Sequence, residues 1–118
     1  MEFFIDDPNI VRLPPADTHL LDLRALPDST GKRLRIFLDL TPFQQKPVIE
    51  LELVDTAGTT ISSATIIEPV GWNLELTMHI RNPAPAHGTY SLTAVLSYPE
   101  LGDIDRRTII LEPSIPAE

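Results

Sequence analysis

Apolar and polar residues alternate along several short stretches of the chain, most clearly at residues 72–80 and 90–98. The apolar positions of the first stretch are Trp72, Leu74, Leu76, Met78 and Ile80. Because successive side chains of a strand point to opposite faces, each stretch predicts a half-buried strand. Such strands are typical of an antiparallel sheet with one face in water.

The same pattern predicts five more strands, at residues 18–26, 34–41, 48–54, 59–67 and 106–112. The strand at 59–67 is poorly patterned and weakly hydrophobic, which is typical of the edge of a sheet. Residues 27–32 and 55–59 contain the turn formers that predict hairpins on either side of them. In the second turn, Gly58 is expected to supply a left-handed backbone conformation.

The chain has 12 prolines, which fall mostly between the apolar stretches. Proline cannot donate a backbone hydrogen bond, so it collects in loops and at strand ends, and no interval between prolines shows a helical period. Seven short strands therefore predict an all-β fold, a two-sheet antiparallel sandwich. We expect one domain at residues 18–113, with an N-terminal arm at 1–17 and a C-terminal tail at 114–118.

Gly88, Thr89 and Tyr90 open the strand at 90–98, and residues 48–61 form an apolar strand, a turn and a return strand. These stretches resemble immunoglobulin-like and fibronectin-type bacterial β-sandwich domains. The resemblance covers roughly residues 18–112 and implies an immunoglobulin-like fold, in which a tyrosine often makes a corner hydrogen bond. The inter-sheet cysteines of antibody domains are absent, and Trp72 lies outside the usual position of their core tryptophan.

Charge and cysteine content narrow the possible partners and chemistry. The net charge is -8 with nine scattered basic residues, which opposes binding to nucleic acid or to an anionic membrane. The absence of cysteine excludes disulfides, thiolate metal sites and a cysteine nucleophile. The N-terminal residues lack the basic start and long apolar core of a secretory signal, so we expect a cytoplasmic protein.

No motif of nucleophilic catalysis or of phosphate binding occurs in the sequence, so we expect neither enzymatic activity nor a cofactor. The acidic residues of the last predicted loop suggest calcium binding. Asp103 and Asp105 follow Glu100, and carboxylates two positions apart on a loop can share a calcium ion. Asp6 and Asp7 are possible distant ligands, although ion pairs with the arginines that follow Asp105 explain the same acidic residues.

The sequence therefore predicts a non-catalytic module that binds a protein partner or assembles with itself. The expected contact residues are Phe3, Phe4, Ile5, Phe37 and Phe43. The arm at residues 1–17 either packs on its own sandwich or adds to the sheet edge of a partner. The alternative is a module that binds calcium or a carbohydrate, although Trp72, Tyr90 and Tyr98 have the parity of the buried face rather than of an exposed aromatic platform.

Overall fold

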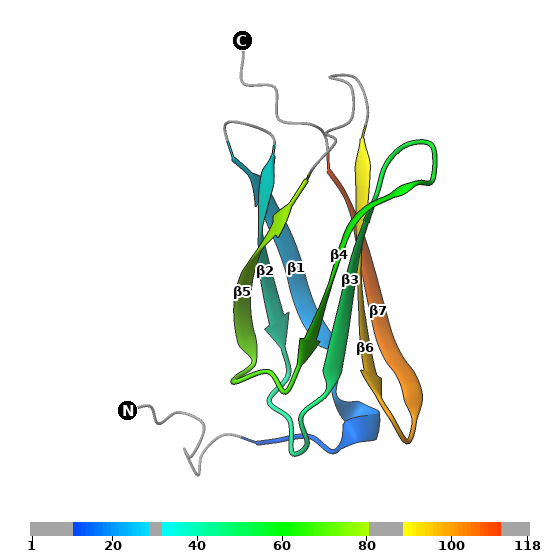
Figure 1. Cartoon of the computed structure of the whole chain (residues 1–118). Helices are drawn as coiled ribbons and strands as arrows, with labels where there is room; N and C mark the ends of the chain where they lie inside the picture. The colour runs from blue at the N-terminus through cyan, green and yellow to red at the C-terminus, as the bar shows by residue number, and fades with distance from the viewer. Residues whose placement is uncertain (1–10, 29–31, 81–88, 112–118) are drawn as a thin grey trace.

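The computed structural model describes residues 11–28, 32–80 and 89–111, which form two antiparallel sheets packed face to face (Figure 1). A short 3-10 turn, η2 (Pro15–Asp17), precedes the first strand. The strands are β1 (Leu20–Pro27), β2 (Arg33–Leu40), β3 (Val48–Val54), β4 (Thr60–Ile67), β5 (Asn73–His79), β6 (Tyr90–Tyr98) and β7 (Gly102–Leu111). The predicted two-sheet antiparallel sandwich of seven strands is confirmed.

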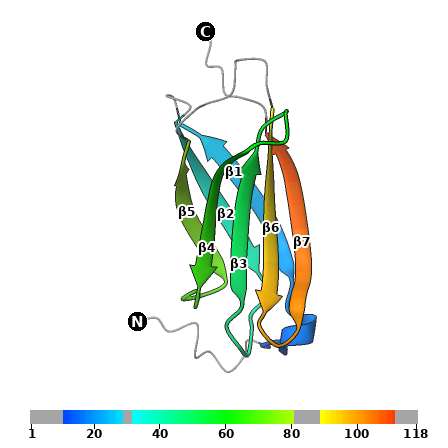
Figure 2. The same cartoon turned by 45° about the vertical axis from the view of Figure 1, so that its right-hand side comes forward.

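One sheet has the order β1-β2-β5 and the other the order β4-β3-β6-β7 (Figure 2). All pairings within the sheets are antiparallel. Along one side of the sandwich β1 lies beside β7, and along the other side β4 lies beside β5. As expected from its weak pattern, β4 is an edge strand.

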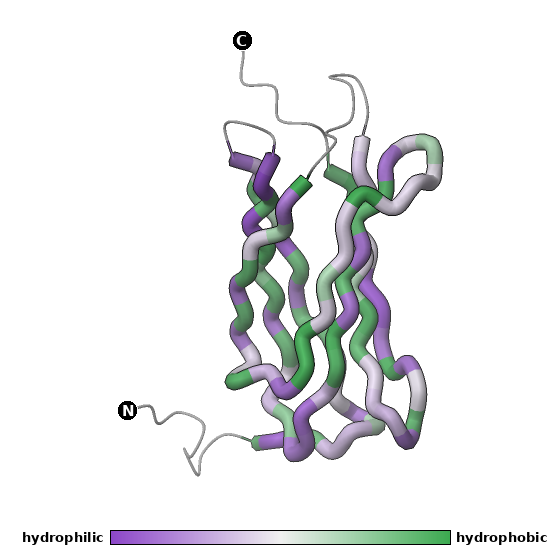
Figure 3. The backbone as a smooth tube through the Cα atoms, viewed as in Figure 1, coloured by the Kyte–Doolittle hydropathy of each residue, from purple (hydrophilic) through white to green (hydrophobic). Residues whose placement is uncertain are grey.

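The core lies between the sheets and is built from the residues of one parity in each strand, an alternation that is visible as green and purple in Figure 3. Its most buried residues come from the central strands β2, β3 and β6. They include Leu34, Ile36, Leu38, Leu40, Ile49, Leu51, Leu53, Leu92, Ala94, Leu96 and Tyr98. In β5, Met78 is buried, whereas Leu74 and Leu76 are only half-buried because that strand lies at a sheet edge. Trp72, which precedes the strand, is also half-buried.

The turn between β3 and β4 forms as predicted. Gly58 has a φ of 88°, in the left-handed region that favours glycine. The Asp55 side chain organises this turn, since its Oδ1 accepts hydrogen bonds from the backbone N–H groups of Ala57 and Thr59. The turn thereby sets the register of β4 against β3.

The last strand begins earlier than predicted. β7 starts at Gly102 rather than at residue 106, so Asp103 and Asp105 belong to a strand and not to a loop. The sequence pattern concealed this start because a bulge interrupts the pairing with β6. Asp105 pairs with Leu96 and Asp103 with Ser97, which leaves one extra residue between them and breaks the period of two.

The described part of the arm packs on its own sandwich. Leu13 forms an isolated bridge with Phe43, through hydrogen bonds from the Leu13 N–H to the Pro42 carbonyl and from the Gln44 N–H to the Leu13 carbonyl. Beyond η2, Thr18 is buried and its hydroxyl donates to the Pro14 carbonyl. Through Leu13, this segment is therefore tied to the loop between β2 and β3.

Candidate functional site

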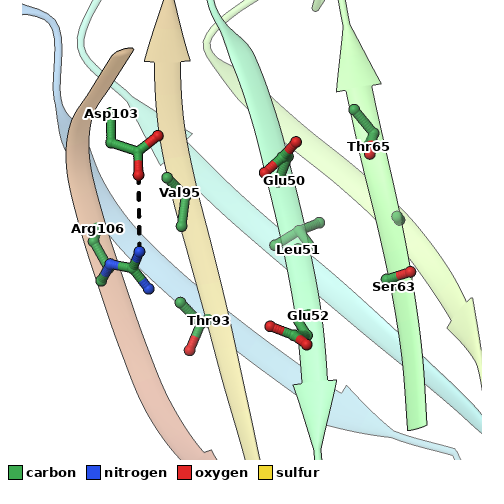
Figure 4. Close-up of a pocket in the computed structure, with 10 residues that line it drawn as sticks. Glu50, Leu51, Glu52, Ser63, Thr65, Thr93, Val95, Asp103 and Arg106 are labelled. Carbon is green, nitrogen blue, oxygen red and sulfur yellow. Dashed lines mark ion pairs between the residues drawn. The ribbon is translucent and has the colours of Figure 1, made fainter. Parts of the chain in front are cut away.

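The outer face of the four-stranded sheet carries a groove of about 350 Å³ (Figure 4). All four strands of the sheet contribute to its lining. The groove was not predicted as a unit, because its residues come from strands that are separated in the sequence and that only the sheet order brings together.

Two carboxylates project into this groove from β3. Glu50 and Glu52 are two positions apart, so the period of two in a strand places both on its outer face (Figure 4). The Glu52 carboxylate accepts a hydrogen bond of 2.6 Å from the Thr60 hydroxyl. Within the described residues, no side chain pairs with Glu50, which leaves its carboxylate available to a ligand.

Three hydroxyl side chains also line the groove, beside the apolar residues Leu51, Ala64 and Val95. Ser63 and Thr65 come from β4, directly across from Glu52 and Glu50, and Thr93 comes from β6. These groups can exchange hydrogen bonds with a polar ligand, since a hydroxyl is both a donor and an acceptor.

An ion pair lies at the β7 side of the groove, where the Arg106 guanidinium is 3.9 Å from the Asp103 carboxylate. The positive charge of Arg106 is therefore matched locally. The carboxylates of Glu50 and Glu52 remain as excess negative charge, which favours a cationic ligand.

On the outer face of the β1-β2-β5 sheet, aromatic and charged side chains contact one another. Phe37 is half-buried between two guanidinium groups, with Arg24 at 5.2 Å and Arg35 at 5.5 Å from its ring centroid. Arg24 also pairs with Asp22 and Arg35 with Glu75. Phe37 stays a predicted contact residue, although its ring is already covered by its own neighbours.

Phe43, another predicted contact residue, is buried. Its side chain is 8% exposed and packs edge-on against Trp72, with ring centroids 6.0 Å apart. Phe43 belongs to the core because the Leu13 bridge draws its loop onto the end of the sandwich. The other predicted contact residues, Phe3, Phe4 and Ile5, lie outside the described residues.

The arrangement of Asp103 and Asp105 does not suit a shared calcium ion. The bulge in β7 places Asp103 on the outer face and Asp105 on the face toward the other sheet. The carboxylate of Asp105 is already bound, because its Oδ2 accepts a hydrogen bond of 2.8 Å from the Leu20 N–H. Within the described residues, no group of three or more potential metal ligands is found.

We expect Asp105→Ala to lower the free energy of unfolding by about 1–3 kcal/mol, because it leaves the partly buried Leu20 N–H without its acceptor. Asp103→Ala is the matched control and should change it by less than about 0.5 kcal/mol, since Asp103 forms only an exposed ion pair. Urea unfolding monitored by tryptophan fluorescence measures both values. Equal effects of the two substitutions would contradict the structural role of Asp105.

Tyr98 closes the other end of the loop between β2 and β3. Its hydroxyl donates a hydrogen bond of 2.7 Å to the Gln45 carbonyl. Burial raises the pKa of the Tyr98 hydroxyl above its ordinary value of 10.0, and the polar side chain of Thr18 partly opposes that rise. The hydroxyl therefore stays neutral in the folded protein at a pH where an exposed tyrosine ionises.

This pKa predicts a loss of stability above pH 10. In the unfolded chain Tyr98 ionises near its ordinary pKa of 10.0, whereas the folded protein retains the proton, so rising pH favours unfolding. Tyr98→Phe should cost about 1 kcal/mol at pH 8, because the hydrogen bond to Gln45 is lost. Urea unfolding of both proteins from pH 8 to pH 11 should show the difference shrinking above pH 10, and a constant difference would contradict the assignment.

Among the described residues, no helix has the length and apolar character that crossing a membrane requires. No protein-family model matches the chain, and a search of curated proteins also finds no match. Solved structures, in contrast, resemble it over most of its length.

A glycosyl hydrolase family 2 member from Bacteroides cellulosilyticus aligns with a TM-score of 0.60 and 13% identity, over 81% of this chain and 15% of that one. A β-glucuronidase from Ruminococcus gnavus aligns with a TM-score of 0.56 and 13% identity, over 80% of this chain and 16% of that one. The chain thus spans about one-sixth of the length of these enzymes. At such low identity the likeness shows a shared fold, a β-sandwich that occurs as a part of larger glycosyl hydrolase chains.

Proposed function

We propose that this chain is a non-catalytic protein-interaction module of the immunoglobulin-like and fibronectin-type kind, and that the groove of the four-stranded sheet is its contact surface. The observation that supports the proposal is the gathering of Glu50 and Glu52 with three hydroxyl side chains in one groove. A protein partner with basic side chains complements these groups in charge and in hydrogen bonding. Absence of catalysis and a cytoplasmic location remain predictions from the sequence.

Carbohydrate binding is the second candidate. Two observations favour it, namely the hydroxyl- and carboxylate-lined groove and the fold shared with parts of carbohydrate-acting enzymes. The aromatic rings argue against it, because none of the described rings lines the groove. Tyr90 and Tyr98 are buried, and Phe37 lies under arginines on the opposite sheet.

A double substitution in the groove tests the proposal. We expect Glu50→Gln/Glu52→Gln to weaken partner binding about fivefold, the effect of losing two exposed ion pairs. The wild-type protein and its variants are immobilised and incubated with a soluble lysate of the source organism. The proteins that each one retains are then quantified by mass spectrometry. Glu68→Gln/Glu100→Gln is the matched control, because it removes the same charge at exposed residues that do not line the groove.

A protein that the wild type and the control retain, and that the groove variant loses, supports the proposal. Equal retention by all three proteins contradicts it. A panel of defined oligosaccharides is added to thermal melts in parallel, since a ligand that binds only the folded state raises the melting temperature. A rise that disappears in the groove variant would favour the carbohydrate candidate instead.

A further inference from the structure

The edge strand β4 differs from the other three edge strands of the two sheets. Its sequence from Thr60 to Ile67 contains no charged residue and no proline, whereas β1, β5 and β7 each carry charged side chains. Natural proteins usually protect an edge strand with such residues, because its unpaired backbone groups can pair with another chain. In the described part of the chain, β3 is the only strand that pairs with β4.

The opposite edge of the same sheet is protected. In β7, Asp105 and Arg107 occupy the face toward the other sheet, where the paired residues of β6 are apolar. Both side chains reach the backbone of β1, since Asp105 accepts from the Leu20 N–H and Arg107 lies 3.5 Å from the Leu20 carbonyl. Charged side chains thus close the β1–β7 side of the sandwich, and the β4–β5 side has no equivalent among the described residues.

An apolar margin lines this open side. Ala64 and Ile66 of β4, together with Leu74 and Leu76 of β5, pack on the core but remain half-buried. The paired residues of the neighbouring strand β3 are fully buried. A strand added beside β4 would place every second side chain against this margin and remove its apolar surface from water.

The outer side of β4 has a different character. Ser63 and Thr65 have short side chains, and the carboxylates of Glu52 and Glu50 lie next to them on β3 (Figure 4). Neighbouring strands are about 4.8 Å apart, so an added strand lies two such spacings from β3. Lysine and arginine carry their charge at the end of a long apolar stem, which can cross the short side chains and reach the carboxylates.

We propose that β4 accepts an extended segment of a protein partner as an additional strand, and that this segment alternates apolar with basic residues. The apolar residues pack at the β4–β5 margin, and the basic residues pair with Glu50 and Glu52. The proposal rests on the proposed function and names the kind of partner that the groove binds. Addition of a strand to a sheet edge is an established mode of peptide recognition.

Synthetic peptides test the proposal on the full-length protein. The probe is a blocked peptide of eight residues, the length of β4, in which lysine alternates with valine. One control has the same composition with lysines and valines in separate blocks, and a second has glutamate in place of lysine. We expect only the alternating lysine peptide to bind, and about fivefold more weakly to Glu50→Gln/Glu52→Gln. Equal binding of the block peptide overturns the proposal.

Backbone methylation distinguishes strand addition from simple charge attraction. In an added strand, alternate residues direct their N–H groups toward the neighbouring strand. Methylating the amides of only the lysines, or of only the valines, should therefore abolish binding in one case and preserve it in the other. If both methylated peptides bind alike and the groove variant still weakens them, strand addition is wrong and the proposed groove function stands.

Hydrogen exchange identifies what occupies the edge. Alternate β4 amides, those directed away from β3, should exchange rapidly in the free protein and slowly with the alternating peptide. Slow exchange of all β4 amides without peptide would overturn the proposal. Dependence of that protection on protein concentration would then identify a second copy as the occupant, and independence would identify a segment of the same chain.

Discussion

Replacing Leu38 by alanine is expected to lower the free energy of unfolding by about 2–5 kcal/mol. Leu38 lies on β2, the central strand of its sheet, and its side chain is 0% exposed. The substitution removes three carbons from a site that cannot easily collapse, because the backbone of β2 is held by hydrogen bonds to β1 on one side and to β5 on the other. Urea unfolding, analysed with a common m-value, measures the loss.

The matched control is Leu26→Ala. Leu26 lies on the neighbouring strand β1 and is 58% exposed, so the same change of side chain removes few buried contacts. Its effect should stay within about 0.5 kcal/mol. If the two substitutions cost the same, the inner and outer faces of the β1-β2-β5 sheet would have been assigned incorrectly.

Phe43→Ala is expected to cost about 3–5 kcal/mol, the range for a large aromatic side chain in a core. The ring packs edge-on against Trp72 at an interplanar angle of 89°, an arrangement that aromatic pairs favour. Its loop is also held by the bridge to Leu13, so the chain cannot easily close around the cavity. Thermal or urea unfolding of the variant measures the loss.

Phe37→Ala makes the same chemical change on the outer face and serves as the control. We expect a cost of about 1–2 kcal/mol, since it removes the contacts with Arg24 and Arg35 but opens no core cavity. The comparison separates the two phenylalanines that the sequence grouped together as contact residues. A larger effect for Phe37 than for Phe43 would contradict the assignment of Phe43 to the core.

The strands of this protein could be predicted because each depends on the alternation of apolar and polar residues within its own sequence. In β6, Tyr90, Leu92, Ala94, Leu96 and Tyr98 alternate without interruption, and all five are buried. The weak pattern of residues 59–67 correctly indicated an edge strand, since only one side of such a strand is paired. Alternation therefore identified both the faces of the strands and one sheet edge.

Prediction failed where a contact between distant segments overrides the local pattern. The bulge in β7 moves Asp103 and Asp105 to opposite faces, although residues two apart on a regular strand share one face. Phe43 lies in a loop without any alternation, and only its pairing with Leu13 explains its burial. Neither feature has a signal in the neighbouring residues.

The candidate site was predictable only in part. The outward positions of Glu50 and Glu52 follow from the period of two in β3, and the lack of charge in β4 can be read directly from its residues. The assembly of these residues into one groove required the strand order β4-β3-β6-β7. Strand order is set by which faces and edges pair most favourably across the whole chain, and no short stretch carries that information.

Composition and alternation alone thus established an all-β chain with seven strands, a defined inner face and no recognisable catalytic motif. Tertiary structure decided which sheet edges are protected by charged side chains, which aromatic rings are buried and which acidic residues line the groove. The physical reason is the range of the interactions. Side-chain parity is a property of adjacent residues, whereas burial at an edge and charge in a groove depend on segments separated by tens of residues.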